Sequence, residues 1–134
     1  GLLEEPRYIL KHVCRHFYEM PANTIREQTF CCGSGSGLNA DELMEMRMRG
    51  GFPRANAVKY VKDKYDVNLL GCICAIDRAV LPALMDYWVP GVQVAGLHEL
   101  VGNALVMKGE KERERDLRGQ PLLTQGAKEG EANV

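Results

Sequence analysis

The sequence TFCCGSGSG occupies residues 29–37, and the rest of the chain is organised around it. Two adjacent cysteines are followed by glycines at every second position, and glycine lets a backbone approach a bound group closely. Asn39 and Asp41 then offer N-caps for a following helix. The pattern predicts a strand end, a tight turn and a helix N-terminus with two thiols at the junction. Because unpaired N–H groups stabilise thiolates there, we expect a site for a thiolate-ligated metal or cluster.

Length and composition restrict the class of protein. The chain has 134 residues, 46% of them apolar, which fits a single globular domain. A net charge of −1 gives no electrostatic reason to expect a nucleic-acid partner. No apolar run approaches the roughly 20 residues of a spanning helix, so we expect no transmembrane segment. Five cysteines without an export signal predict a cytoplasmic protein with free thiols, because an odd number cannot form a closed disulfide framework.

The order of predicted elements indicates the fold class. Strands that alternate with helices predict an α/β fold, a small Rossmann-like unit with a short, mostly parallel sheet and flanking helices. This unit covers residues 1–107, and the charged, Gly- and Pro-containing stretch at 108–134 is expected to be a mobile, disordered tail. Hydrophobic periodicity predicts strands over residues 25–31, 68–74 and 91–95, and helices over 4–20, 41–49, 54–65, 75–88 and 98–107.

Four of the five cysteines follow two of these predicted strands. Cys31 and Cys32 end the first, and Cys72 and Cys74 end the second. The carboxyl ends of parallel strands form the edge where open α/β sheets bind ligands, so the two pairs are expected to converge. Four thiolates suit zinc or an iron–sulfur cluster. Adjacent cysteines are awkward ligands for one ion, whereas several irons offer separate attachment points.

Three longer blocks carry a resemblance to a known family. They are NTIREQTFCCGSG at residues 23–35, RGGFPRANA at 49–57 and ICAIDRA at 73–79. Together they resemble the C-terminal, cysteine-rich CCG domain of DsrK-like subunits, which belong to the heterodisulfide reductase catalytic-subunit family. Such subunits are part of the membrane complex DsrMKJOP of dissimilatory sulfite reduction. The likeness covers residues 6 to 107 approximately.

The resemblance implies a function for the parent protein. A noncubane [4Fe-4S] cluster would reduce, or reversibly oxidise, a disulfide or trisulfide on a DsrC-like sulfur carrier protein, with electron transport through other subunits of the membrane redox complex. The subunit would be cytoplasmic and peripheral to the inner face of the membrane. The resemblance also implies an oxidoreductase as the full subunit, with this fragment alone inactive.

The resemblance assigns roles to individual residues. Cys31 and Cys32 match the paired ligands, and Cys74 matches the final ligand of the closing motif, so these three are the expected catalytic residues. Cys72 departs from the family pattern, because the spacing here is C-x-C and the family has C-x2-C; it is either a ligand or a thiol beside the ligands. Gly33 and Gly35 are expected to contribute N–H contacts to the cluster.

One expected ligand is missing from the chain. It would lie before Gly1, and Cys14 is too close to the pair to replace it. The chain is therefore interpreted as a C-terminal fragment that lacks further domains, and such a fragment would bind zinc or no metal in place of the cluster.

Two other functions fit the same residues. One is a structural zinc–thiolate module held by the four cysteines. The other is a docking domain without catalysis, which would use the methionines Met44, Met46 and Met48 together with the C-terminal tail. For the disulfide-reducing subunit that the resemblance implies, four arginines could recognise an acidic partner surface or simply be solvated: Arg47, Arg49, Arg54 and Arg78.

Overall fold

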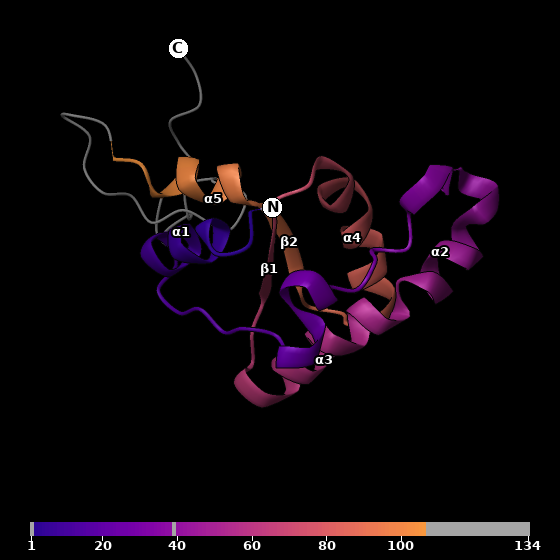
Figure 1. Cartoon of the computed structure of the whole chain (residues 1–134), viewed down its shortest axis with the longest axis horizontal. Helices are drawn as coiled ribbons and strands as arrows, with labels where there is room; N and C mark the ends of the chain where they lie inside the picture. The colour runs from indigo at the N-terminus through magenta and orange to yellow at the C-terminus, as the bar shows by residue number, and fades with distance from the viewer. Residues whose placement is uncertain (1, 39, 107–134) are drawn as a thin grey trace, which may run out of the picture.

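A two-stranded parallel sheet lies at the centre of the computed structural model, which describes residues 2–38 and 40–106. Strand β1 (Leu69–Cys72) pairs with β2 (Gln93–Gly96) in a register that runs from Leu69 opposite Gln93 to Cys72 opposite Gly96. Helix α4 (Ala75–Trp88) connects the two strands, as the crossover between parallel neighbours requires (Figure 1).

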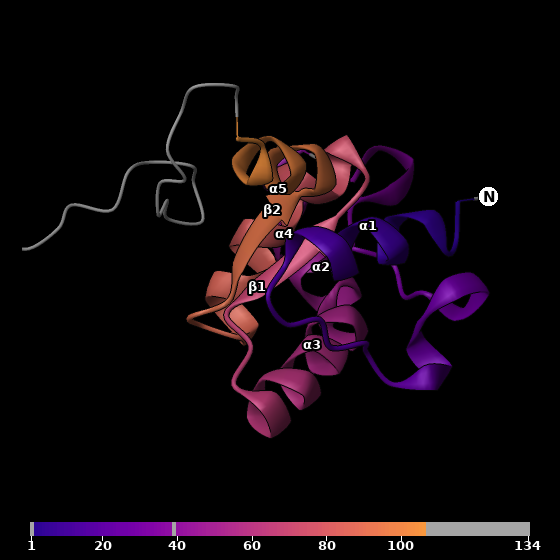
Figure 2. The same cartoon turned by 90° about the vertical axis from the view of Figure 1, so that its left-hand side faces the viewer.

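Helices cover both faces of the sheet. Helices α1 (Glu5–Val13) and α5 (Leu97–Ala104) contact each other on one side, and α4 and α3 (Phe52–Tyr65) contact each other on the opposite side, as both views show (Figures 1 and 2). Helix α2 (Met44–Gly50) extends beyond α3. The predicted α/β unit, with a parallel sheet and flanking helices, is confirmed.

The main core lies between the sheet, α3 and α4. Side chains at helical spacing on α4, Leu81, Leu84 and Met85, are almost fully buried. They pack with apolar residues of α3 and both strands, namely Ala55, Val58, Cys72, Val92 and Val94. On the opposite face of β1, a side chain at Gly71 would meet Leu10 of α1 at 3.3 Å and Leu100 of α5 at 3.8 Å. The sheet therefore separates two apolar layers.

The structure corrects three predicted elements. The strand expected at 25–31 is wrong: Arg26–Gln28 forms a 3₁₀ turn, and Arg26 has a left-handed φ of 56°. Residues 26–31 are all exposed, so there is no buried face to favour pairing with the sheet. The first helix ends at Val13, since Cys14 is extended. The helix predicted over 41–49 starts as a 3₁₀ turn, Asp41–Leu43.

The other predicted elements agree with the structure to within a few residues. Two more 3₁₀ turns, Ala22–Thr24 and Gly35–Gly37, complete the described elements. No helix in residues 2–38 and 40–106 is long and apolar enough to cross a bilayer. The predicted tail at 108–134 lies outside the described residues.

We predict that Leu84→Ala lowers the free energy of unfolding by about 2–5 kcal/mol, because it leaves a cavity between α4 and its neighbours. The matched control is Ile76→Ala on the same helix, whose side chain is 48% exposed and should cost about 1 kcal/mol or less. Urea unfolding followed by circular dichroism measures both. Equal losses for the two variants would contradict this description of the core.

Candidate functional site

The Cys31 thiol lies in a turn whose backbone N–H groups favour its anionic form. Its side chain is exposed, and the Gly33 N–H donates a hydrogen bond to Cys31 Sγ at 3.3 Å. This bond lowers the pKa of the Cys31 thiol against a smaller opposing effect of burial, with further contributions from the N–H groups of Gly35 and Ser34. A ring of N–H donors around one sulfur is an environment suited to a thiolate.

The turn can form only because Gly33 has no side chain. Gly33 has a φ of +90°, and a Cβ atom there would lie 2.3 Å from the carbonyl oxygen of Arg47 and 2.9 Å from the nitrogen of Gly51. The turn therefore rests directly on the backbone where α2 ends and α3 begins. The sequence indicated a break at this junction and did not show that the break supports the thiols.

The glycines of the junction are needed for the same contact. A Cβ on Gly51 would lie 2.9 Å from the Cys32 carbonyl oxygen and 2.7 Å from Leu84 of α4, and Gly50 lies against Gly33. Trp88 holds the end of α2 in place, because its Nε1 donates to the Met48 carbonyl at 2.9 Å. Helix α4 thus contacts the glycine pair, and the glycine pair contacts the thiol turn.

Cys32 points in a different direction from Cys31. Its side chain is half-buried and packs against the main core. Burial raises the pKa of the Cys32 thiol, and the neighbouring Asp77 carboxylate raises it further. Asp77 lies in the first turn of α4, so the paired cysteines are next to the N-terminus of that helix. The adjacent thiols therefore differ in acidity: the surroundings lower the pKa of Cys31 and raise that of Cys32.

The second pair of cysteines spans the end of β1, and its two thiols have different surroundings. Cys74 is the exposed N-cap residue of α4, three residues before Asp77. Cys72 is the last residue of β1 and faces the main core, where its Sγ lies 3.5 Å from the Ala95 carbonyl oxygen. Burial raises the pKa of the Cys72 thiol to about 11. The structure thus brings Cys74 to the same helix end as the Cys31–Cys32 turn and directs Cys72 into the core.

The donor chemistry fits a thiolate-ligated group at Cys31, Cys32 and Cys74. Among residues 2–38 and 40–106, however, no three His, Cys, Asp or Glu side chains are arranged to hold a metal ion. One further group next to the thiols is unsatisfied: Ser34 is only 2% exposed, and its hydroxyl has no hydrogen-bond partner in the described part of the chain. A buried hydroxyl of this kind is costly unless a ligand or water bonds it.

Only some of the residues proposed for docking can contact a partner protein. Arg49 pairs with Glu45 and Arg78 with Glu99. Arg47 is buried, and Arg54 bonds to the backbone near the thiols. Of the methionines, Met44 and Met46 are exposed, whereas Met48 packs against the core. The four arginines therefore do not form one uncommitted basic patch.

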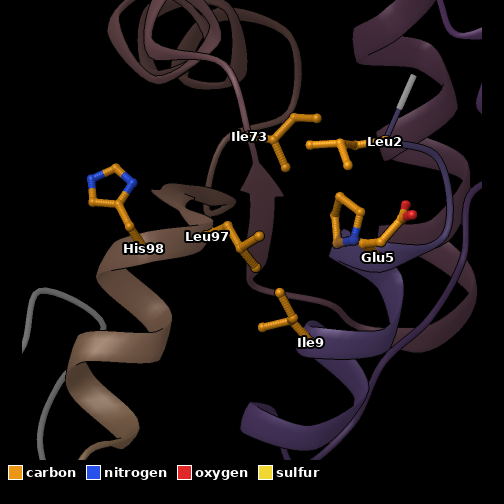
Figure 3. A pocket seen from close by; sticks show the side chains of 7 residues that line it. Leu2, Glu5, Ile9, Ile73, Leu97 and His98 are labelled. Carbon is orange, nitrogen blue, oxygen red and sulfur yellow. The ribbon is translucent and has the colours of Figure 1, made fainter.

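A shallow pocket lies at the carboxyl end of β1, on the face of the sheet that α1 and α5 cover. It has a volume of about 270 Å³ and is bounded by the starts of α1 and α5 and by the residue after β1 (Figure 3). Its lining is mostly apolar: Leu2, Pro6, Ile9, Ile73 and Leu97, with Glu5 and His98. No cysteine lines this pocket, so we place the candidate site at the thiol turn.

Comparisons with known proteins were made on the whole chain. No protein-family model and no solved structure matches it. An Hdr-like menaquinol oxidoreductase iron-sulfur subunit 2 of Archaeoglobus fulgidus is 54% identical over 126 residues, which are 91% of this chain and 23% of the relative. The chain is similar to one segment of an Hdr-like iron–sulfur subunit. A corresponding subunit of Archaeoglobus profundus is 53% identical over 126 residues, again 91% of this chain and 23% of the relative.

These relatives confirm part of the predicted resemblance. They support a likeness to heterodisulfide-reductase-like iron–sulfur subunits, whereas the closer likeness to DsrK and to the CCG domain stays a prediction. The chain spans 23% of the length of the curated relatives it matches, so these matches do not by themselves show the activity of a whole subunit.

Arg54, Asp77 and Gly51 were not predicted as parts of this site. Each is distant in sequence from the cysteine pair, and each is brought to it by the packing of α3 and α4. The pair of adjacent glycines at 50–51 is unusual between two helical segments, and it was the sequence feature that could have pointed to a close backbone contact.

We predict that Gly33→Ala destabilises the chain more than Gly37→Ala does. Both glycines have a left-handed φ, +90° and +86°, but a Cβ at Gly37 would meet no described atom within 4 Å. Gly37→Ala should cost about 1–2 kcal/mol from backbone strain, and Gly33→Ala about 1–3 kcal/mol more from overpacking. Urea unfolding measures the difference, and equal costs would argue against the close contact with α2.

We also predict that Cys31 reacts with an alkylating reagent at lower pH than Cys32 or Cys72. The pKa of Cys31 is lowered and those of Cys32 and Cys72 are raised, so the thiolate of Cys31 is the first to form as pH rises. Labelling each cysteine-containing peptide across a pH series, with fragmentation to separate Cys31 from Cys32, measures the three midpoints. In denaturant the difference should vanish. Coincident midpoints in the folded chain would contradict the assignment.

Proposed function

We propose that this chain is part of an Hdr-like iron–sulfur subunit and that Cys31, Cys32 and Cys74 bind its cluster. The observation that carries the proposal is the turn at Cys31, where backbone N–H groups favour an exposed thiolate. The chain is similar to an iron–sulfur subunit over 91% of its length, so an iron–sulfur cluster is the group that we expect such a thiolate to bind. Cys72 is proposed as a fourth ligand, which requires its side chain to turn away from the core.

The residues around the thiols have separate parts in this proposal. The N–H groups of Gly33 and Gly35 lower the charge density on the Cys31 sulfur and so tune whatever it ligates. The Ser34 hydroxyl supplies a buried donor for a bound sulfur atom. A noncubane [4Fe-4S] cluster, when bound, would supply one-electron chemistry at sulfur.

The proposed reaction of the complete subunit is reduction, or reversible oxidation, of an S–S bond. The substrate is a disulfide or trisulfide on a DsrC-like sulfur carrier protein. The names of the relatives suggest menaquinol as the electron donor. Oxidation of one menaquinol releases two electrons and two protons, which together convert one S–S bond into two thiols. The electrons would pass through other subunits of the complex, with this subunit on the cytoplasmic face of the membrane.

A docking function without catalysis is the second candidate. It is favoured by Met44 and Met46, which are 37% and 56% exposed at the start of α2. Methionine side chains at a surface adapt readily to a partner. This function predicts binding to other subunits that survives substitution of the cysteines.

We predict that Cys31→Ala, Cys32→Ala and Cys74→Ala each remove most of the iron and sulfide from the complete subunit when it is purified without oxygen. Cys14→Ala is the matched control, because Cys14 is a half-buried thiol at the end of α1, remote in sequence from the turn. Iron, zinc and sulfide analysis with visible and EPR spectra provides the measurement. Unchanged iron in the Cys31 and Cys32 variants would overturn the proposal, and zinc without iron would favour the structural module.

A further inference from the structure

Arg54 is fixed beside the paired thiols by its own hydrogen bonds. It lies in the first turn of α3, and its Nε and Nη2 donate to the Phe30 carbonyl oxygen at 2.9 Å and 2.5 Å. Phe30 is the residue directly before Cys31. Two bonds from one planar guanidinium to one oxygen restrict its position, so a positive charge is held at the entrance to the thiol turn.

The charge of Arg54 is not neutralised by a carboxylate within ion-pair distance. In the described part of the chain, Arg7, Arg26, Arg49 and Arg78 each pair with a glutamate, whereas Arg54 forms no ion pair. Its guanidinium is half-buried, and burial lowers the pKa of Arg54 against the opposing effects of Asp77, Cys32 and Cys31. Two of its five N–H groups donate to Phe30, and the other three form no hydrogen bond within residues 2–38 and 40–106.

The other groups that surround Cys31 are also donors. The N–H of Gly33 points at its sulfur, and the N–H groups of Ser34 and Gly35 contribute to the same environment. Asp77 is the carboxylate that acts on this pair of thiols, and it acts on Cys32. The exposed side of the turn therefore combines a fixed cation with backbone dipoles of the same sign, an arrangement that attracts anions.

We propose that Arg54 makes this site selective for anionic groups, such as a thiolate or persulfide, that bind beside Cys31. Its guanidinium would stabilise negative charge on sulfur that binds or leaves there. The identity of sulfur as the natural ligand rests on the proposed function. The selectivity for anions rests on the position of Arg54 alone and is present without any cluster.

The test compares two alkylating reagents of similar shape on the reduced, metal-free chain. Iodoacetate is an anion and iodoacetamide is neutral, and each is attacked by the same thiolate, forming a C–S bond as iodide leaves. The ratio of the two rates at Cys31 therefore cancels the thiolate fraction and reports the local charge. Fragmentation mass spectrometry of the labelled peptide separates Cys31 from Cys32.

Arg54→Gln should lower the ratio of the iodoacetate rate to the iodoacetamide rate at Cys31 by about threefold to fivefold, as expected for loss of one nearby charge close to a protein surface. Arg54→Lys should retain most of the ratio, because it keeps the charge. Lys59→Gln is the matched control: it removes one positive charge from the same helix, where Lys59 pairs with Asp63, and should leave the ratio unchanged.

Two results would overturn the proposal: an unchanged ratio in Arg54→Gln, or an equal decrease in Lys59→Gln. Circular dichroism verifies that each variant is folded. Arg54→Met provides a second neutral variant that keeps an unbranched apolar stem, in case Gln at this position prevents folding. Because no metal is present, failure of this test is distinguishable from failure of the proposed function, which would appear as unchanged iron in the cysteine variants.

Discussion

The close contact between the cysteine turn and the α2–α3 junction is the constraint on which the rest of the site depends. No Cβ fits at Gly33 or at Gly51, because each would meet backbone atoms of the other segment at 2.9 Å or less. Two stretches of backbone can approach so closely only where both lack side chains. Leu84 of α4 lies directly behind Gly51, so the position of the thiols is linked to the most buried part of the core.

This contact also explains why two adjacent cysteines acquire different chemistry. In the turn, Cys31 is exposed to solvent and to backbone N–H donors, while Cys32 packs against the core beside Asp77. Backbone dipoles stabilise a charged sulfur, and burial penalises it. Neighbours in sequence therefore have pKa values that shift in opposite directions. A site of this kind can present one thiol that ionises more readily than its neighbour.

The end of strand β1 gives the second pair of cysteines different surroundings. Side chains alternate across a strand, so Cys72, at the end of β1, is directed to the core face together with Leu70. Cys74 lies beyond the strand, at the N-cap of α4, where it is exposed. The helix that starts there connects β1 to β2, and its first turn carries Asp77 to the Cys32 thiol. The parallel β1–α4–β2 unit thus brings the two cysteine segments to one helix end.

The sequence by itself determined the parts of this protein that depend on local pattern. Apolar spacing predicted α3, α4 and both strands of the sheet, and the cysteine–glycine motif indicated the thiol site. The strand at 25–31 was wrong, since pairing depends on a partner and a buried face, and residues 26–31 are all exposed. Only the tertiary structure decided that Cys72 faces the core, that Gly51 supports the turn and that Arg54 lies beside Cys31. These are contacts between residues far apart in the sequence, and their geometry is decided by how α3 and α4 pack, which no local pattern encodes.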